Sequence, residues 1–180
     1  MRHVVFCLLL IFSVTVQANE TDRLRQAAFP AQFHELALKN QTVLVYLWAD
    51  VYAAALYSPV DTSAKAAWDQ QKDLRLALYY FRDIDRTDVI KAANTTLERQ
   101  QTSATLARLK PELDQLHAAF RNIRSGDQYA LDFRPGRGLN LEINNQEVFS
   151  SRNDELAKVY LGIWLAPKGL SDSLRNTLLN

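Results

Sequence analysis

Five tyrosines could donate hydrogen bonds to a ligand, because all of them fall on segments with strand-like patterns: Tyr46, Tyr52, Tyr57, Tyr79 and Tyr80. A phenol inside an apolar cavity is a good donor to a carboxylate or carbonyl oxygen. Any single tyrosine is more often a core or rim residue, so each also has a purely structural interpretation.

Basic residues close to these tyrosines could pair with an anionic head group. Arg82 directly follows Tyr79-Tyr80-Phe81, and Lys39 precedes the apolar segment 42–59. Either cation would form charge-assisted hydrogen bonds with a carboxylate. Arg137 lies in a Pro-Gly-Arg-Gly turn and can equally be a solvated loop charge.

Asp50 separates two apolar runs, VLVYLWA and VYAAALY. It could be a proton carrier with a raised pKa, a residue at a strand junction, or an interruption in a membrane span. Each run has the length and composition of a strand, which argues against a span. Since no acid or histidine is obviously paired with it, we expect a solvent-facing residue at a bulge or strand junction.

Small residues in the second run, Ala53 to Ala55, leave room that a helix or a ligand must fill, and a helix is the commoner answer. The sequence shows no nucleophile with a neighbouring base, no phosphate-binding glycine loop and no zinc signature. His34 and His117 are far apart and have no cysteine partners. We therefore expect no metal and no cofactor.

Strands are predicted in three regions. The first spans residues 29–57, and the second is DLRLALYYF at 73–81. In the third, QYALDFRP and LNLEIN alternate strictly between apolar and polar residues, with turns at 135–138 and 144–145 and a short strand near Val148. This pattern predicts an antiparallel meander.

Helices are predicted between and after these strands. One begins near Asp85, a second contains Leu106 to Ile123 with Pro111 as a kink or restart, a third starts at Asn153 or Asp154, and a short one follows Ser171. Each has one apolar stripe. The predicted fold class is α+β, an antiparallel sheet covered on one face by helices.

Residues 1–18 have the pattern of a secretory signal, with Arg2 and His3 before an uncharged run and Val16-Gln17-Ala18 as a cleavage site. An N-terminal membrane anchor is the alternative. Cleavage would leave a single domain, residues 19–180, with 20 bases, 20 acids and no cysteine. We expect secretion across the inner membrane into the periplasm and no nucleic-acid partner.

Four segments together resemble the chalcone isomerase-like proteins of bacteria: VYAAALY at 51–57, FRDI at 81–84, SGDQYALDFRPGRGLNLEIN at 125–144 and LGIWLAPKGLSDSLRNTLL at 161–179. The resemblance covers nearly the whole chain after the signal. It implies an open-faced β-sandwich, a long antiparallel sheet with helices on one side and a ligand cleft between them.

The resemblance also implies site residues, because the family holds plant enzymes that close a chalcone and related proteins that bind fatty acids. The enzymes' strand threonine matches Tyr52, and a helix asparagine matches Asn94. Their arginine is missing between Lys39 and Pro59, where Asn40 or Leu44 takes its place. Without that arginine, the loss of oxyanion stabilisation makes the plant reaction doubtful.

Three functional hypotheses follow. The first is an exported, non-enzymatic binder of a fatty acid or similar apolar ligand, with no catalytic residue assigned. The second is an isomerase or intramolecular lyase on an unknown substrate, and the third is an envelope protein that acts through an unknown partner. For the first, the candidate ligand contacts are Tyr52, Arg82, Lys39, Ala54, Tyr80 and Asn94.

Overall fold

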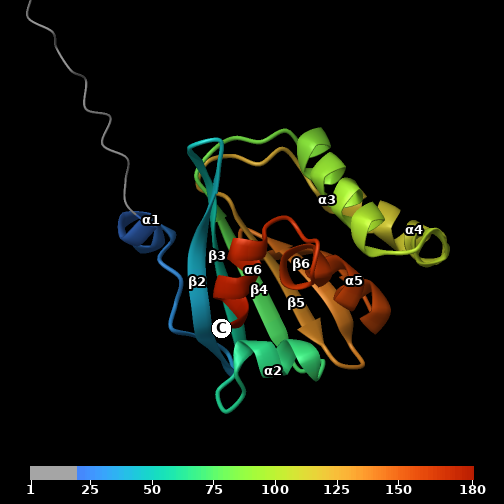
Figure 1. Cartoon of the computed structure of the whole chain (residues 1–180), viewed down its shortest axis with the longest axis horizontal. Coiled ribbons are helices and arrows are strands. Elements are labelled where there is room, and N and C mark those ends of the chain that lie inside the picture. The colour runs from blue at the N-terminus through green and yellow to red at the C-terminus, as the bar shows by residue number, and fades with distance from the viewer. Residues whose placement is uncertain (1–19) are drawn as a thin grey trace, which may run out of the picture.

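Seven strands form one antiparallel sheet, and each strand lies beside the one before it in the chain (Figure 1). The computed structural model describes residues 20–180, so the predicted signal at 1–18 lies outside the described residues. The strands are β1 (Gln32–Phe33), β2 (Leu36–Tyr46), β3 (Ala49–Pro59), β4 (Leu74–Tyr80), β5 (Gln128–Arg134), β6 (Gly138–Ile143) and β7 (Gln146–Ser151). The predicted meander is confirmed.

Alternation along the central strands gives the sheet one strongly apolar face. Tyr52 of β3 pairs with Tyr80 of β4, and Leu76 of β4 pairs with Leu131 of β5. Successive side chains of a strand point to opposite faces, so these residues share one side of the sheet. That side belongs to the main hydrophobic core.

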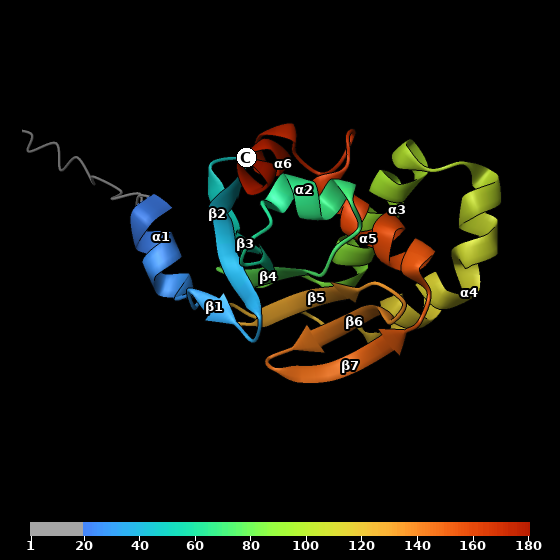
Figure 2. The same cartoon turned by 90° about the horizontal axis from the view of Figure 1, so that it is seen from below.

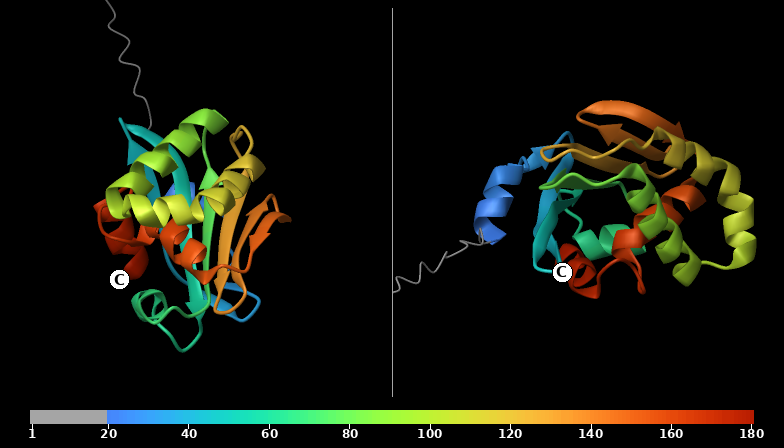
Figure 3. Two further views of the ribbon diagram at one scale, coloured as in Figure 1. Left: turned by 90° about the vertical axis from the view of Figure 1, so that its right-hand side faces the viewer. Right: turned by 90° about the horizontal axis from the view of Figure 1, so that it is seen from above.

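Helices cover this apolar face (Figures 2 and 3). In Figure 2, α2, α5 and α6 lie inside the curve of the sheet, and α1 lies outside it, against β2. Among the described residues, no helix combines the length and hydropathy that crossing a membrane requires. The helices are α1 (Glu20–Ala27), α2 (Ala64–Asp69), α3 (Arg86–Gln100), α4 (Ser103–Ala119), α5 (Asp154–Leu165) and α6 (Asp172–Leu179).

The helix starts agree with the cap residues expected from the sequence, with one difference. The Asn153 side chain accepts hydrogen bonds from the backbone N–H groups of Glu155 and Leu156 and so caps α5. Asp85 occupies the N-cap position of α3, but its side chain makes no capping hydrogen bond. α4 continues through Pro111, and α1 and α2 were not predicted.

Two of the hairpins turn on two residues in the left-handed region. Leu47 and Trp48 join β2 to β3 with φ of 46° and 67°, and Asn144 and Asn145 join β6 to β7 with φ of 51° and 64°. A right-handed sheet twist favours such turns, and Asn and Gly are the residues that adopt them most readily. The β2–β3 turn therefore uses unfavourable residue types.

Asp50 lies next to a bulge just after this turn. Leu44 pairs with Tyr52 and Val45 pairs with Asp50, which leaves Val51 unpaired. The predicted junction is confirmed. The expectation that Asp50 faces solvent is wrong, because its carboxylate lies 2.6 Å from the Arg23 guanidinium of α1 and the side chain is only 20% exposed.

Candidate ligand-binding cavity

A cavity of about 330 Å³ lies between the apolar face of the sheet and helices α3 and α5. Its volume is at the lower end of the range of about 300–1,000 Å³ typical of small-molecule sites. Ten lining residues belong to the sheet: Leu44, Tyr46, Val51, Tyr52, Leu76, Leu78, Tyr80, Tyr129, Leu131 and Leu141. The others are Ile84, Asp88, Val89, Ala92, Ala93, Phe120, Tyr160, Ile163, Trp164 and Leu170.

Aromatic rings form a continuous wall of the cavity. The Tyr52 ring contacts the Tyr80 ring edge-on at 5.4 Å between centroids, and Tyr80 contacts Tyr129 at 5.5 Å. On the helix side, Tyr160 lies 6.2 Å from Trp164. Such tilted arrangements stabilise aromatic clusters beyond the area they bury, so the wall is expected to be rigid.

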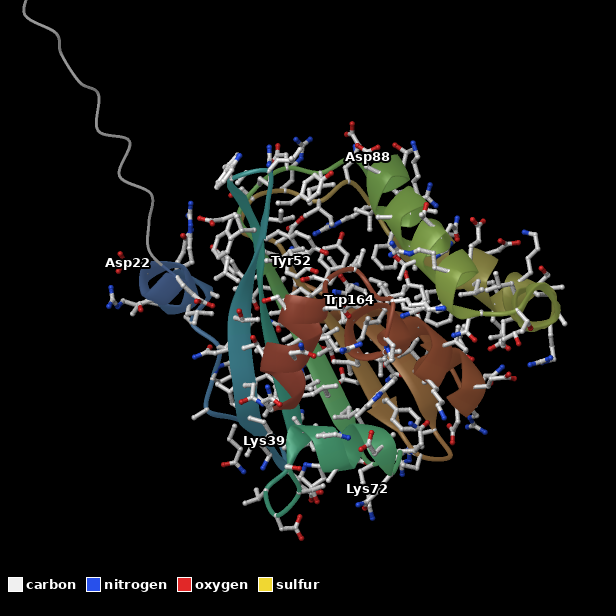
Figure 4. All side chains as sticks on the ribbon, viewed as in Figure 1. Asp22, Lys39, Tyr52, Lys72, Asp88 and Trp164 are labelled. Carbon is white, nitrogen blue, oxygen red and sulfur yellow. The ribbon has the colours of Figure 1, made fainter. Side chains whose placement is uncertain are left out.

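One buried hydrogen bond connects the sheet to the helix layer across this wall. The Trp164 indole N–H donates to the Tyr52 hydroxyl over 3.0 Å. In Figure 4 the labelled Tyr52 and Trp164 lie close together in the middle of the molecule. The Tyr52 hydroxyl accepts this bond, and its own hydrogen remains available to a ligand oxygen.

Three buried tyrosines of the cavity, Tyr52, Tyr80 and Tyr160, are neutral at physiological pH. Burial raises the pKa of Tyr52 well above its usual value, against a smaller lowering by the Trp164 hydrogen bond. Burial is also the largest cause that raises the pKa of Tyr80 and of Tyr160. These phenols can donate hydrogen bonds, but they do not act as anionic bases near pH 7.

A second hollow adjoins the cavity and shares Tyr46, Val51, Ile84 and Asp88 with it. Arg82 is exposed in this hollow.

Arg124 also lines this hollow, and its Nη1 atom lies 3.0 Å from the Oδ2 atom of Asp83, with which it forms an ion pair. The hydrogen bond from the Ser125 backbone and the pairing with Arg124 lower the pKa of Asp83. The Arg82 side chain has no hydrogen bond or ion pair within residues 20–180, so it is the available cation at this mouth.

The predicted contact residues are only partly brought together. Tyr52 and Tyr80 line the cavity, and Arg82 lies in the adjoining hollow. Ala54 is fully buried beside them but is not a lining residue, and α2 and α6 pack on its strand. The alanine run thus makes room for helices.

Lys39 and Asn94 lie away from the cavity. The Lys39 ammonium donates to the Val60 carbonyl over 2.9 Å, at the opposite end of the molecule from Asp88 in Figure 4. Asn94 is exposed on α3, on a different side from Ala93, which lines the cavity.

The residues at the positions proposed for the missing arginine have other roles. Leu44 lines the cavity as an apolar side chain. Asn40 donates to the backbone carbonyl of Leu178 over 3.0 Å and so holds the C-terminal helix α6 against β2. Among the described lining residues, Asp88 is the only charged one.

Sequence reasoning missed the helix side of the site. Tyr160 and Trp164 fall on the apolar stripe of the helix predicted to start at Asn153 or Asp154, and such a stripe predicts core residues. Periodicity shows that a side chain is covered, but it does not tell a core contact from a cavity wall. The spacing of Tyr160 and Trp164, one helical turn apart, was the available signal.

An antiparallel sheet, a helix layer and an apolar cavity between them define an α+β protein with the architecture of a small-molecule binding site. The chain belongs to the chalcone isomerase-like family, whose profile matches residues 22–180. The resemblance seen in the sequence is thereby confirmed.

Among solved structures, a fatty-acid binding protein of Arabidopsis thaliana is similar in fold, with a TM-score of 0.62 and 16% sequence identity. The alignment covers 84% of this chain and 90% of the Arabidopsis chain. A search of curated proteins gave no match. At this identity the structural similarity shows the fold, and it confirms the predicted class.

Proposed function

We propose that the protein binds a fatty acid or similar apolar ligand without transforming it, with the acyl chain in the cavity and the head group at the mouth. The observation that carries this proposal is the apolar, aromatic-lined cavity of about 330 Å³. Family membership and the fold shared with a fatty-acid binding protein support it.

The lining of the cavity disfavours a charged head group inside it. A carboxylate deep in the cavity would lose its hydration and meet no cation among the described lining residues. At the mouth it keeps contact with water and can pair with Arg82. We therefore expect the head group to lie nearer to Arg82 than to the Tyr52–Trp164 pair.

Ligand retention tests the proposal directly. We expect native mass spectrometry after gentle purification to show a bound lipid, and we expect added decanoate to raise the melting temperature, because a ligand that binds only the folded state stabilises it. A protein that carries no lipid and is not stabilised by decanoate or longer fatty acids would rule the proposal out.

Arg82→Gln tests the orientation of the ligand. The substitution should weaken decanoate binding about three- to tenfold, since an exposed charge-assisted contact contributes modestly. Binding of decanol, which has no charge, should not change. Arg137→Gln is the matched control, because Arg137 is an exposed arginine in the turn between β5 and β6 and does not line the cavity.

We also propose that the protein is exported to the periplasm, as the signal-like residues 1–18 indicate. Sequencing the N-terminus of the protein recovered from the cell envelope should give Asn19 as its first residue. Recovery of chain that begins at Met1 would contradict cleavage.

A further inference from the structure

The tip of the β2–β3 hairpin exposes four large apolar residues in a row, Val45 to Trp48. Their exposed fractions are 52% for Val45, 65% for Tyr46, 75% for Leu47 and 89% for Trp48. Isolated exposed apolar residues are ordinary, whereas a contiguous group marks an interaction surface. We call residues 45–48 the hairpin tip.

The residue types at the turn are not those that its backbone conformation favours. The β6–β7 hairpin of the same sheet uses the same two-residue left-handed turn and fills it with Asn144 and Asn145, as turn chemistry favours. Leu47 and Trp48 adopt that conformation less readily and expose apolar surface to water. Both costs fall on one turn, so closing the hairpin does not by itself account for these two residue types.

The hairpin tip lies at the mouth of the cavity. Tyr46 belongs to the tip and lines both the cavity and the adjoining hollow. In Figure 1 the β2–β3 turn lies at the same end of the molecule as the connection from β4 to α3, which carries Arg82. Tyr46 thus joins the hairpin tip to the lining of the cavity.

We propose that the hairpin tip inserts into the surface of a lipid bilayer and so places the cavity mouth against the membrane. Trp and Tyr prefer the membrane interface, where their apolar rings are buried and their polar atoms stay hydrated. Residues 41–49 carry no charge, and the next residue, Asp50, is neutralised by Arg23. The tip therefore meets a bilayer without burying an unpaired charge.

The size of the tip favours a bilayer over a protein partner. Each side of a stable protein complex buries about 800 Å². An aromatic side chain buries about 150–250 Å² when fully covered, so two aromatic and two aliphatic side chains fall short of that area. A narrow projection also gives little surface for complementary packing, whereas a fluid bilayer closes around it.

This inference extends the proposed function, on which its purpose rests: an apolar ligand would pass between membrane and cavity without crossing water. The membrane contact itself can be tested separately. We expect the protein to float with phosphatidylcholine vesicles in a density gradient. Vesicles of brominated phosphatidylcholine should quench Trp48 fluorescence.

Leu47→Asn/Trp48→Gly is the decisive variant, because it installs residues that the turn prefers and removes the apolar tip. Vesicle binding should fall at least tenfold while the melting temperature does not fall. Val60→Ser is the matched control: Val60 is 67% exposed, lies beyond the other end of β3, and should not affect binding. Trp48→Phe should keep vesicle binding and lose most of the quenching.

Two results would overturn the inference: wild-type protein that does not float with vesicles, or a double variant that floats equally well. Dimers of the wild type that the double variant disperses, without vesicle binding, would instead assign the tip to a second copy and overturn it too. Decanoate stabilisation in vesicle-free buffer is measured alongside. If decanoate stabilises a protein that does not bind vesicles, only this inference fails. If the protein binds vesicles but is not stabilised by decanoate, only the proposed function fails.

Discussion

At the scale of single residues, the Tyr52–Trp164 hydrogen bond has the clearest energetic role. Tyr52→Phe removes the acceptor and leaves a buried indole N–H without a partner. We expect the free energy of unfolding to fall by about 1–3 kcal/mol, the cost of an unsatisfied buried polar group. Denaturant unfolding monitored by circular dichroism measures it.

Tyr79→Phe is the control for this substitution. Tyr79 lies on the neighbouring strand, and its hydroxyl makes no hydrogen bond within residues 20–180. Its loss should therefore change stability by less than about 0.5 kcal/mol. Equal effects of the two substitutions would show that the hydrogen bond to Trp164 contributes nothing beyond the loss of a hydroxyl.

His117 makes stability depend on pH. It is buried on α4, its ring lies 5.8 Å from that of Tyr160, and its Nε2 atom has no hydrogen-bond partner among the described residues. Burial is the largest cause that lowers the pKa of His117 below 6.5, Arg86 and Lys110 add to it, and Asp114 opposes it.

The unfolded chain therefore binds a proton more readily than the folded one. Stability should be unaffected by His117 above about pH 6.5 and should decrease as pH falls from there toward the lowered pKa. His117→Phe keeps an aromatic ring and should flatten the stability profile between about pH 6.5 and 5, where few carboxylates titrate. A profile unchanged by the substitution would show that another group is responsible.

At the scale of elements, one ion-pair cluster ties three strands together on the outer face of the sheet. Arg75 of β4 pairs with Asp132 of β5 and Glu142 of β6, and the Phe33 ring covers its guanidinium at 3.6 Å. Arg75 itself is buried. Burial is the largest cause that raises the pKa of Asp132, and Arg75 counteracts it.

Arg75→Met should destabilise the protein by about 2–4 kcal/mol near neutral pH, because it leaves two partly buried carboxylates without their ion-pair partner. The loss should shrink as the pH falls, since a carboxyl with a raised folded-state pKa is stabilised by protonation. Arg124→Met removes an exposed pair with Asp83 and should cost much less, because water and salt screen exposed pairs. Equal losses would refute the structural role of the cluster.

Replacing the two residues of the β2–β3 turn should increase the stability of the protein. Leu47→Asn/Trp48→Gly should raise the free energy of unfolding by about 1–2 kcal/mol. Left-handed backbone disfavours each bulky residue by about 1–2 kcal/mol, and the freedom that the new glycine loses on folding and the smaller cost that the new asparagine keeps offset part of the gain. Leu47→Ser/Trp48→Ser removes the same apolar groups and keeps the backbone cost, so it should bring little gain. A similar gain from both variants would assign the effect to lost apolar exposure.

The features of the fold that the sequence predicted correctly are those that depend on residues close together in the chain. The alternation in β4 to β6, the Asn144-Asn145 turn and the Asn153 cap were all readable, because each depends on neighbouring residues. α1 was missed because it is short and mostly polar, with Ala27 as its one buried residue, and α2 was missed because it has only six residues. The Arg23–Asp50 pair was missed because it joins residues 27 positions apart through an unpredicted helix.

The candidate site was predictable only on its sheet side. Tyr52 and Tyr80 stood out as polar groups within apolar strands, and both line the cavity. Lys39 and Asn94 have suitable chemistry but lie elsewhere, because strand register and helix phase decide where a side chain points. A periodic pattern predicts which side chains face the core, but it does not predict which of them line a cavity within the core.

At the scale of the whole molecule, a ligand in the cavity should stabilise the folded protein. A side chain that fills the cavity should abolish this stabilisation. Ala93→Phe places a ring where α3 lines the cavity. We expect the variant to remain about as stable as the wild type without ligand, since the ring occupies empty volume, and to lose the stabilisation by decanoate.

The same exchange at Ala157 is the matched control, because Ala157 is fully buried on α5 and does not line the cavity. Overpacking there should cost about 1–3 kcal/mol. Because the substitution leaves the cavity itself free, stabilisation by decanoate should persist in any folded fraction. Thermal unfolding of both variants across a decanoate titration separates the two effects. If Ala93→Phe still gains stability from decanoate, the ligand binds outside this cavity.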